Sequence, residues 1–297
     1  MDLEAVRTFI KVAELRSFTR AAEHIGLSKS RVALRVKALE EELGVRLLQR
    51  TTRSVHATPD GEQFLLRAQR LIEDADELGT MFLPQRSLRG QVRIDMAIGM
   101  ARDVVIPRIP ELQAQYPNIE LQIGSTDRLI DLVRDGFDFV LRAGTVREPG
   151  LVAKRLGVMP MTNVASVDYI RTYGTPRTLE DLDRHLVVHY TGTFGTDAPT
   201  FEYRDGAKTV DKPMRATVTV NNVAAYHAAC RAGLGIIQVP RSGVLDDLAD
   251  RHLVEVLPEH VCAPLPVSLV YAEGRPLSRR VRVVMAWLSQ LVSPRLA

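Results

Sequence analysis

Apolar residues near the N-terminus recur at helical spacing and predict a small helical domain. A first helix, ending near Leu15, would bury the stripe Leu3, Val6, Ile10 and Ala13. Farther along, the residues that fall at i, i+4, i+7 and i+11 are Val32, Val36, Leu39 and Leu43. This spacing places one apolar stripe along a helix. The two stripes can pack against each other and form one core.

Residues 18–37, FTRAAEHIGLSKSRVALRVK, predict two short helices joined by a tight turn. Ser17 and Ser28 can each cap a helix, because a serine hydroxyl accepts a hydrogen bond from a first-turn N–H. Gly26 supplies the left-handed residue that ends the first of these helices. The segment therefore has the pattern of a helix-turn-helix.

The second of these helices is cationic on the side opposite its apolar stripe. That side carries Ser30, Leu34, Lys37 and Ala38, flanked by Arg31 and Arg35. A helix fits the major groove, where guanidinium groups bind guanine edges and apolar groups touch the thymine methyl. We therefore interpret residues 29–37 as a recognition helix. The alternative is a three-helix unit for protein contacts whose basic face is only solvated, and the pattern favours DNA.

The segment after this helix has the composition of a wing. Residues 45–48, VRLL, follow the helix stop Gly44 and predict a short strand, and residues 50–54, RTTRS, follow as a turn. Hydroxyls, backbone N–H groups and guanidinium groups bind phosphate and position a protein on DNA without reading its sequence. An ordinary basic hairpin would have the same composition.

A longer helix should begin at Thr58-Pro59-Asp60, which offers a capping hydroxyl, a proline at the first helical position and an acid beside the positive helix end. Its apolar positions are spaced 4, 3, 4, 3 and 4, and they are Phe64, Ala68, Leu71, Ala75, Leu78 and Phe82. A 3.5-residue repeat is typical of a supercoiled seam. We interpret the helix as a dimerisation helix, although a helix packed on its own domain would also fit this short run.

From Gln91 onward, strand and helix patterns alternate. Strands are predicted at 92–98, 119–123 and 137–141, with helices at 105–116 and 127–135. This β-α-β-α-β order predicts a parallel sheet covered by helices. A second, similar lobe should follow, with strands at 162–165, 186–189, 215–220 and 235–239 and helices at 179–183, 223–232 and 242–249. A last strand at 266–271 and a closing helix at 278–291 complete the chain.

The fold class is therefore α/β: a winged helix-turn-helix, a linker helix, and a two-lobed domain with two doubly wound sheets. The predicted domains are 1–58 for DNA binding, 59–89 for the linker and dimerisation helix with its hinge, and 90–297 for ligand binding. Within the last, lobe I comprises about 90–160 and 266–297, and lobe II about 161–265.

Ligands in such sheets bind at the carboxyl ends of strands, where loops lead into helix N-termini. Four loops have this position: 99–102, 125–126, 142–144 and 221–222. Together they offer hydroxyls, amides, N–H groups and two arginines, which suits a small anionic or polar molecule. The alternative is that Arg102 and Arg142 are ordinary surface or interlobe arginines.

Charge is distributed unevenly along the chain of 297 residues, whose formal net charge is +3. Residues 1–59 hold 11 Lys and Arg against 7 Asp and Glu, and the other 238 residues hold 28 against 29. The basic excess therefore lies in the segment with the helix-turn-helix, as binding to phosphate would require.

The sequence shows no catalytic or metal-binding motif. GxSxG, HExxH, Walker and CxxC patterns do not occur. His185 and His189 fall in a strand pattern, which would separate them by roughly 13 Å. Cys230 and Cys262 are too few for a disulfide framework. The N-terminus has no signal-peptide pattern and no apolar run approaches membrane-spanning length, so we expect a soluble cytoplasmic protein without a cofactor.

The motifs SFTRAAEHIGLSKS, KALEEELGVRLLQRTTRSVHATPDGE, DLVRDGFDFVLRAG and AGLGIIQVP occur in order across nearly the whole chain. By these the chain resembles the LysR-type transcriptional regulators. The resemblance implies a winged helix-turn-helix, a linker helix and a two-lobed effector domain like a periplasmic binding protein. It also implies a homodimer or homotetramer, an imperfect dyad operator in double-stranded DNA, and a small-molecule effector between the lobes. RNA polymerase is a further candidate partner.

Pattern and resemblance together give two sets of candidate residues. The DNA-binding candidates are Phe18, Thr19, Ser28, Lys29, Ser30, Arg31, Leu34, Arg35, Lys37, Arg50, Thr51 and Arg53. The effector-binding candidates are Met100, Ala101, Arg102, Ser125, Thr126, Arg142, Ala143, Gly144, Phe201 and Asn222.

The chain departs from the resemblance at two places. Members commonly carry Gln-Ser-Ala-Val-Ser-Arg where residues 29–34 read KSRVAL, so two charges are gained and one arginine is lost on the DNA-facing side. Small or hydroxyl residues are common where Arg102 stands, and this arginine favours an acidic effector. Two other hypotheses stay open: a thiol-based redox sensor on the same scaffold, and a solute-binding protein or enzyme with a vestigial helix-turn-helix.

Overall fold

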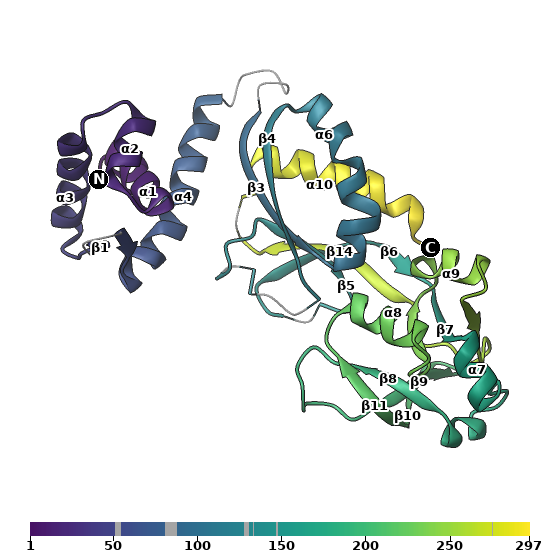
Figure 1. Cartoon of the computed structure of the whole chain (residues 1–297). Coiled ribbons are helices and arrows are strands. Elements are labelled where there is room, and N and C mark those ends of the chain that lie inside the picture. The colour runs from purple at the N-terminus through teal and green to yellow at the C-terminus, as the bar shows by residue number, and fades with distance from the viewer. Residues whose placement is uncertain (51–54, 81–87, 128–130, 133, 147, 275) are drawn as a thin grey trace. The chain divides into compact units, whose positions relative to one another are not determined.

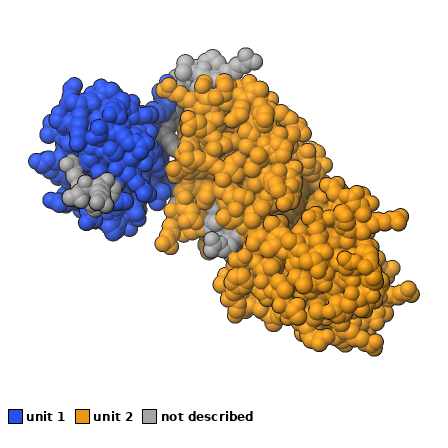
Figure 2. All heavy atoms as spheres, in the orientation of Figure 1, with its two compact units in different colours: residues 1–88 blue, residues 89–297 orange. Residues whose placement is uncertain are grey.

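The computed structural model describes residues 1–50, 55–80, 88–127, 131–132, 134–146, 148–274 and 276–297. The chain forms two compact units, Met1–Leu88 and Arg89–Ala297 (Figure 2). Each unit has hydrophobic clusters of its own.

The described part of the first unit consists of helices and one pair of antiparallel strands (Figure 1). Its elements are α1 (Leu3–Leu15), α2 (Phe18–Ile25), α3 (Lys29–Leu43), the antiparallel strands β1 (Leu48–Arg50) and β2 (Val55–Ala57), and α4 (Pro59–Thr80). The predicted helices are confirmed, whereas the predicted end of the long helix, beyond Phe82, lies outside the described residues. The predicted strand at 45–48 was placed too early, because the Glu40 carboxylate accepts the backbone N–H groups of Leu47 (2.8 Å) and Leu48 (3.0 Å). These bonds hold the residues after Gly44 against α3, so pairing with β2 begins only at Leu48.

The stripes of α1 and α3 meet in the core of this unit, where the predicted residues Val6, Val32, Val36 and Leu39 are almost completely buried. Phe9, which was not predicted, is buried with them, whereas the predicted end residues Leu3 and Leu43 are 40% and 36% exposed. The first half of α4 packs on the same core. Phe64 lies edge-on to Phe9, with ring centroids 5.4 Å apart, and Ala68 and Ile72 are buried.

The 3.5-residue seam of α4 is divided between two environments. Phe64 and Ala68 face the unit's own core, whereas Leu71 is 38% and Leu78 72% exposed. Phe82 lies outside the described residues. The seam is therefore partly a core face and partly an uncovered apolar edge.

Lobe I is built on a five-stranded sheet in the order β4-β3-β5-β14-β6. Its strands are β3 (Arg89–Met96), β4 (Asn118–Ser125), β5 (Phe139–Ala143), β6 (Leu151–Met159) and β14 (Leu265–Ala272). The predicted parallel pairing is confirmed for β3 with β4 and β5. Strands β14 and β6 complete the sheet in antiparallel pairing. Helix α10 (Arg279–Val292) packs on β3, and the 3₁₀ turn η6 (Ser293–Arg295) follows it.

The first helical segment of lobe I begins earlier than the sequence pattern indicated. Helical turns run without a break through α5 (Ile98–Met100), the π-helical η2 (Ala101–Val105), the 3₁₀ turn η3 (Ile106–Arg108) and α6 (Ile109–Gln115). Residues 99–102, predicted as a loop, are therefore helical. The Asp127 carboxylate accepts the N–H of Ile98 and so starts the helix there. The described part of the predicted helix 127–135 forms bends and turns, and the rest lies outside the described residues.

Lobe II contains three small ladders. Strands β11 (Arg215–Val220) and β8 (Leu186–Tyr190) pair in parallel, and β7 (Met161–Ser166) lies between the antiparallel β12 (Ile237–Pro240) and β13 (Leu253–Glu255). Helix α8 (Val223–Arg231) packs on β7 and β8. The remaining helical elements are α7 (Val167–Tyr173), η4 (Glu180–Arg184), η5 (Arg241–Gly243) and α9 (Leu245–Ala249).

The third ladder is a hairpin that the sequence interpretation missed. Strands β9 (Thr200–Asp205) and β10 (Lys208–Pro213) pair antiparallel on either side of Gly206, whose φ is 60°. The dipeptide Asp205-Gly206 is a strong hairpin signal. The strands β6 and β13 and the helix α7 were also not predicted.

Candidate DNA-binding surface and effector site

Two serine caps and one glycine turn position the recognition helix. The Ser17 hydroxyl accepts the N–H of Arg20 at 3.3 Å, and the Ser28 hydroxyl accepts the N–H of Arg31 at 3.3 Å. Between the helices Gly26 adopts a φ of 74°, the left-handed conformation that ends α2. These three local interactions fix the start of α3 relative to α2.

Most of the predicted DNA contacts lie together on an exposed surface. The exposed candidates at the N-terminal side of α2 and on α3 are Thr19, Ser28, Lys29, Ser30, Arg31, Leu34 and Lys37. Leu34 is 68% exposed although it is an apolar residue in the middle of a helix. A leucine that the domain core leaves uncovered, beside hydroxyls and cations, is chemically suited to the thymine methyl and the phosphates.

Phe18 and Arg35 lie elsewhere than predicted. Phe18 is only 6% exposed and belongs to the core of the first unit, so we assign it to packing and not to the DNA-facing surface. Arg35 points to α1: its guanidinium lies 3.4 Å from the Thr8 hydroxyl and 3.6 Å from the Glu4 carboxylate. The side chain of Arg50 and the whole of Thr51 and Arg53 lie outside the described residues.

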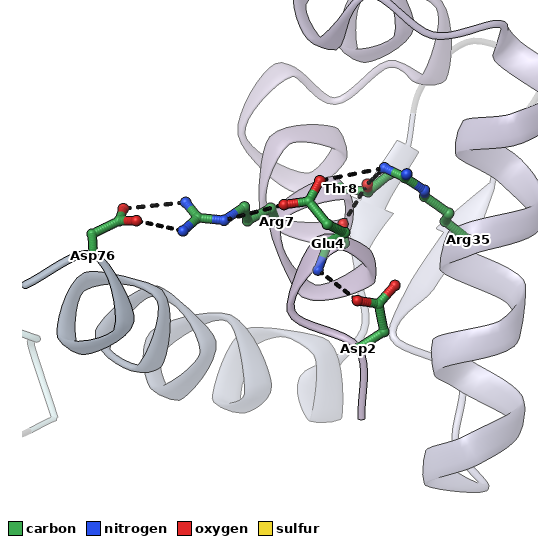
Figure 3. Close-up of polar contacts among 6 residues, drawn as sticks. All are labelled: Asp2, Glu4, Arg7, Thr8, Arg35 and Asp76. Carbon is green, nitrogen blue, oxygen red and sulfur yellow. Dashed lines mark hydrogen bonds and ion pairs between the residues drawn. The ribbon is translucent and has the colours of Figure 1, made fainter. Parts of the chain in front are cut away.

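Arg35 is the end of a chain of charges that joins three helices (Figure 3). The Glu4 carboxylate also approaches Arg7 at 3.6 Å, and Arg7 binds both oxygens of Asp76 on α4, at 2.5 and 3.2 Å. Because these groups are 32–59% exposed, each ion pair stabilises the fold by about 1 kcal/mol or less. The chain's effect is geometric, since it links α4 and the recognition helix to α1, which lies between them (Figure 3).

In lobe I, Arg102 is turned to the surface. Its side chain is 62% exposed and forms a two-point ion pair with the neighbouring Asp103, at 2.6 and 2.8 Å. Ala101, beside it, is 2% exposed and packs inward. Met100 is half-buried in the same turn. The Arg102 guanidinium therefore already has an anionic partner.

The other predicted contacts of lobe I lie at the ends of β4 and β5. Ser125 is exposed, and the Thr126 hydroxyl donates to the Asp95 carboxylate at 3.4 Å. Arg142 and Ala143 end β5, and Gly144 follows with a φ of 111°. Arg142 lines a cavity of about 20 Å³, which is room for about one water molecule.

Asp127 of lobe I reaches the start of helix α8 in lobe II, which Asn222 caps. Asn222 caps α8 of lobe II, since its side-chain oxygen accepts the N–H of Ala225 at 2.9 Å. The Asp127 carboxylate of lobe I accepts the N–H of Val223 at 2.7 Å and that of Ile98 at 3.2 Å. Asp127 was not among the predicted residues, although it stands directly after Ser125 and Thr126 at the carboxyl end of β4. That position in the sequence could have identified Asp127 as a candidate.

Phe201 does not belong to this group. It is fully buried and packs with Tyr169, Leu182 and Val187 in a core cluster of lobe II. This overturns its assignment as an effector contact, because a side chain enclosed by its own lobe presents no surface to a ligand.

The two cysteines are poorly suited to redox sensing. Cys230 is completely buried and Cys262 is 7% exposed. Burial raises the pKa of the Cys230 thiol to about 12 and that of Cys262 to about 11. Because the thiolate is the reactive form, both positions disfavour oxidation.

Comparison with known proteins agrees with this geometry. A family model described as "LysR substrate binding domain" matches residues 85–293, and one described as "Bacterial regulatory helix-turn-helix protein, lysR family" matches residues 3–62. The chain belongs to the LysR family of transcriptional regulators. The family consists of regulators and not of enzymes, and its members combine a DNA-binding helix-turn-helix with an effector-binding domain.

Individual LysR-type proteins are similar over the full length. The chain is 41% identical to the transcriptional regulator YhjC of Escherichia coli (strain K12) over 288 residues, which are 97% of this chain and 96% of the other. It is 32% identical to DmlR of the same organism over 292 residues, 97% and 94% of the two chains. The solved structure of CrgA, a LysR-type regulator from Neisseria meningitidis, is 30% identical and gives a TM-score of 0.61 over 98% of each chain.

Proposed function

We propose that this LysR-type regulator reads an imperfect dyad operator with the exposed face of α3. We propose further that its binding to this operator changes when a small molecule binds between lobes I and II. The observation that supports the first part is the recognition helix itself, capped by Ser28 and presenting Lys29, Arg31 and the uncovered Leu34. The division into residues 1–58, 59–89 and 90–297 is part of the same proposal.

The assembly that we propose is a homodimer, or a tetramer made of dimers, formed through α4. Leu71 and Leu78 support it, because they lie on the 3.5-residue seam and their own unit leaves them exposed. A dimer also suits the groove-reading helix, since two copies can bind half-sites about one helical turn apart. RNA polymerase at a promoter is a further proposed partner, and the cytoplasm is the proposed location. No described helix has both the length and the apolar composition needed to cross a membrane.

The proposed effector is a small molecule that carries an acid group. Arg142 supports this, since it is half-buried at the end of β5, where ligands bind in such sheets. Arg102 supports it less than the sequence suggested, because Asp103 already neutralises its charge. An effector that binds one interlobe arrangement better shifts the oligomer towards that arrangement and so changes half-site spacing or DNA bending.

The test is fluorescence anisotropy with the promoter DNA beside the protein's own gene and with a scrambled duplex, both at one near-physiological salt concentration. We expect a large ratio of specific to nonspecific affinity for the wild type. Arg31→Ala should abolish most of that ratio. Arg171→Ala is the matched control, because it also removes one exposed arginine, but from lobe II.

A ratio near one for the wild type would count against this DNA as the operator. A ratio that Arg31→Ala leaves unchanged would contradict the assigned face of α3. Equal losses in Arg31→Ala and Arg171→Ala would show that net charge, and not the helix face, determines affinity.

A further inference from the structure

One carboxylate joins the two lobes of the second unit. The oxygens of Asp127 accept hydrogen bonds from two backbone N–H groups, those of Ile98 at 3.2 Å and Val223 at 2.7 Å. Ile98 is the first residue of α5 in lobe I, and Val223 is the first residue of α8 in lobe II. The shorter of the two bonds is the one that crosses between lobes.

The neighbouring residues make this carboxylate the shared cap of both helices. Ala97, which precedes α5, has no side-chain group that could cap it. Asn222 caps α8 through Ala225, and the N–H of Val223 is bound by Asp127 instead. The helices also approach closely, since a Cβ built on Gly99 would lie 3.9 Å from Val223 Cγ1.

A carboxylate is well matched to this position. The first N–H groups of a helix lack partners within the helix and carry a partial positive charge. A hydrogen bond from such a group to an ionised acceptor is about twice as strong as a neutral one. Separating the lobes would break the bond to Val223 and keep the one to Ile98.

We propose that Asp127 is an interlobe latch: its bond to Val223 holds α8 of lobe II on α5 of lobe I and sets how readily the lobes separate. The part of this inference that concerns regulation by an effector rests on the proposed function. Any effector that changes the distance between the lobes changes the strength of this bond. The latch residue is therefore a determinant of the effector-free state, whether or not it touches the effector.

Hydrogen–deuterium exchange of the full-length protein tests the latch. We expect Asp127→Ala to accelerate exchange roughly tenfold or more in two sets of peptides, those covering 98–105 and those covering 223–231. Both helix starts lose their hydrogen-bond acceptor in this variant. Asp127→Asn should give a smaller effect, since its amide can accept only through its oxygen. Sodium formate, compared with sodium chloride at equal ionic strength, should partly restore protection in Asp127→Ala.

The matched control is Asp181→Ala. The Asp181 carboxylate also accepts two backbone N–H groups, those of Arg177 at 2.8 Å and Thr178 at 3.0 Å, but both lie in one loop of lobe II. This variant should change exchange only near 177–184. Acceleration confined to 98–105 in Asp127→Ala would overturn the latch, since it would show a cap within lobe I alone.

If Asp127→Ala fails to fold, Asp127→Asn provides the test: unchanged protection at both 98–105 and 223–231 would overturn the inference. A titration with operator DNA tests separately whether the latch affects DNA binding. We expect Asp127→Ala to change specific affinity at least threefold and Asp181→Ala to leave it unchanged. A wild type without specific DNA binding would contradict the proposed function while the exchange data still test the latch.

Discussion

Asp95 on β3 is a buried acid whose charge should cost stability at neutral pH. It is 4% exposed, and no described residue donates a hydrogen bond to its Oδ1. Burial raises its pKa from 3.8 to about 6, and the Thr126 hydroxyl and the charge of Arg142 only partly oppose this. A pKa change of this size corresponds to about 3 kcal/mol.

The direction of the pH dependence follows from proton binding. The folded state binds the Asp95 proton more tightly than the unfolded state. Its contribution is therefore most favourable below pH 3.8, declines as the pH rises to about 6, and is fully unfavourable above that value. Asp95→Asn removes the charge and keeps the shape, so it should stabilise the second unit by up to about 3 kcal/mol near pH 7.5 and by much less near pH 4.5.

Urea unfolding followed by tryptophan fluorescence measures this gain. Trp287, the single tryptophan of the chain, lies in α10 and reports on the second unit alone. Asp138→Asn is the matched control beside the same sheet. Asp138 directly precedes β5, its carboxylate accepts the N–H of Arg93 at 2.9 Å, and its replacement should give no gain at either pH. Equal stability of Asp95→Asn and wild type near pH 7.5 would refute the reasoning, as would the same gain at both pH values.

Three further predictions concern the first unit. Leu34→Ala should weaken specific operator binding by about 1–2 kcal/mol, about five- to thirtyfold, because 68% of this side chain is available for burial; unchanged anisotropy titrations would place it away from DNA. Gly61→Ala should cost about 1–3 kcal/mol or more in thermal unfolding, since its Cβ would lie 1.9 Å from the Leu47 carbonyl oxygen. Gly79→Ala in the same helix meets no atom of the described residues within 4 Å and should not destabilise the unit. Leu78→Asp should dissociate the proposed dimer in sedimentation without lowering the stability of the unit, because Leu78 is 72% exposed; an unchanged mass would remove α4 from the interface.

Local signals in the sequence determined the first unit almost completely. Ser17, Gly26, Ser28 and Gly44 fix helix ends through interactions that span four residues or fewer, so the pattern alone predicts them. The apolar stripes of these helices then pack together in one core. The LysR-type motifs extended the prediction to the order of the domains, which the comparisons confirm.

The direction in which a side chain points was harder to predict from the sequence. Phe18 lies in a predicted helix and Phe201 in the missed strand β9, and for both rings the choice between facing the core and facing a ligand depends on the neighbouring elements. Arg35 shows the same limit, because its partner Glu4 comes from another helix.

The boundary between the lobes was decided by tertiary structure alone. The sequence shows that Asp127 follows a strand, but its bonds to Ile98 and Val223 join residues 29 and 96 positions away. The early start of the helix at Ile98 has the same cause, since its cap comes from Asp127 and not from the preceding Ala97. A periodic pattern records which face of an element is buried, whereas the partner of a polar group at the end of that element depends on how distant segments pack.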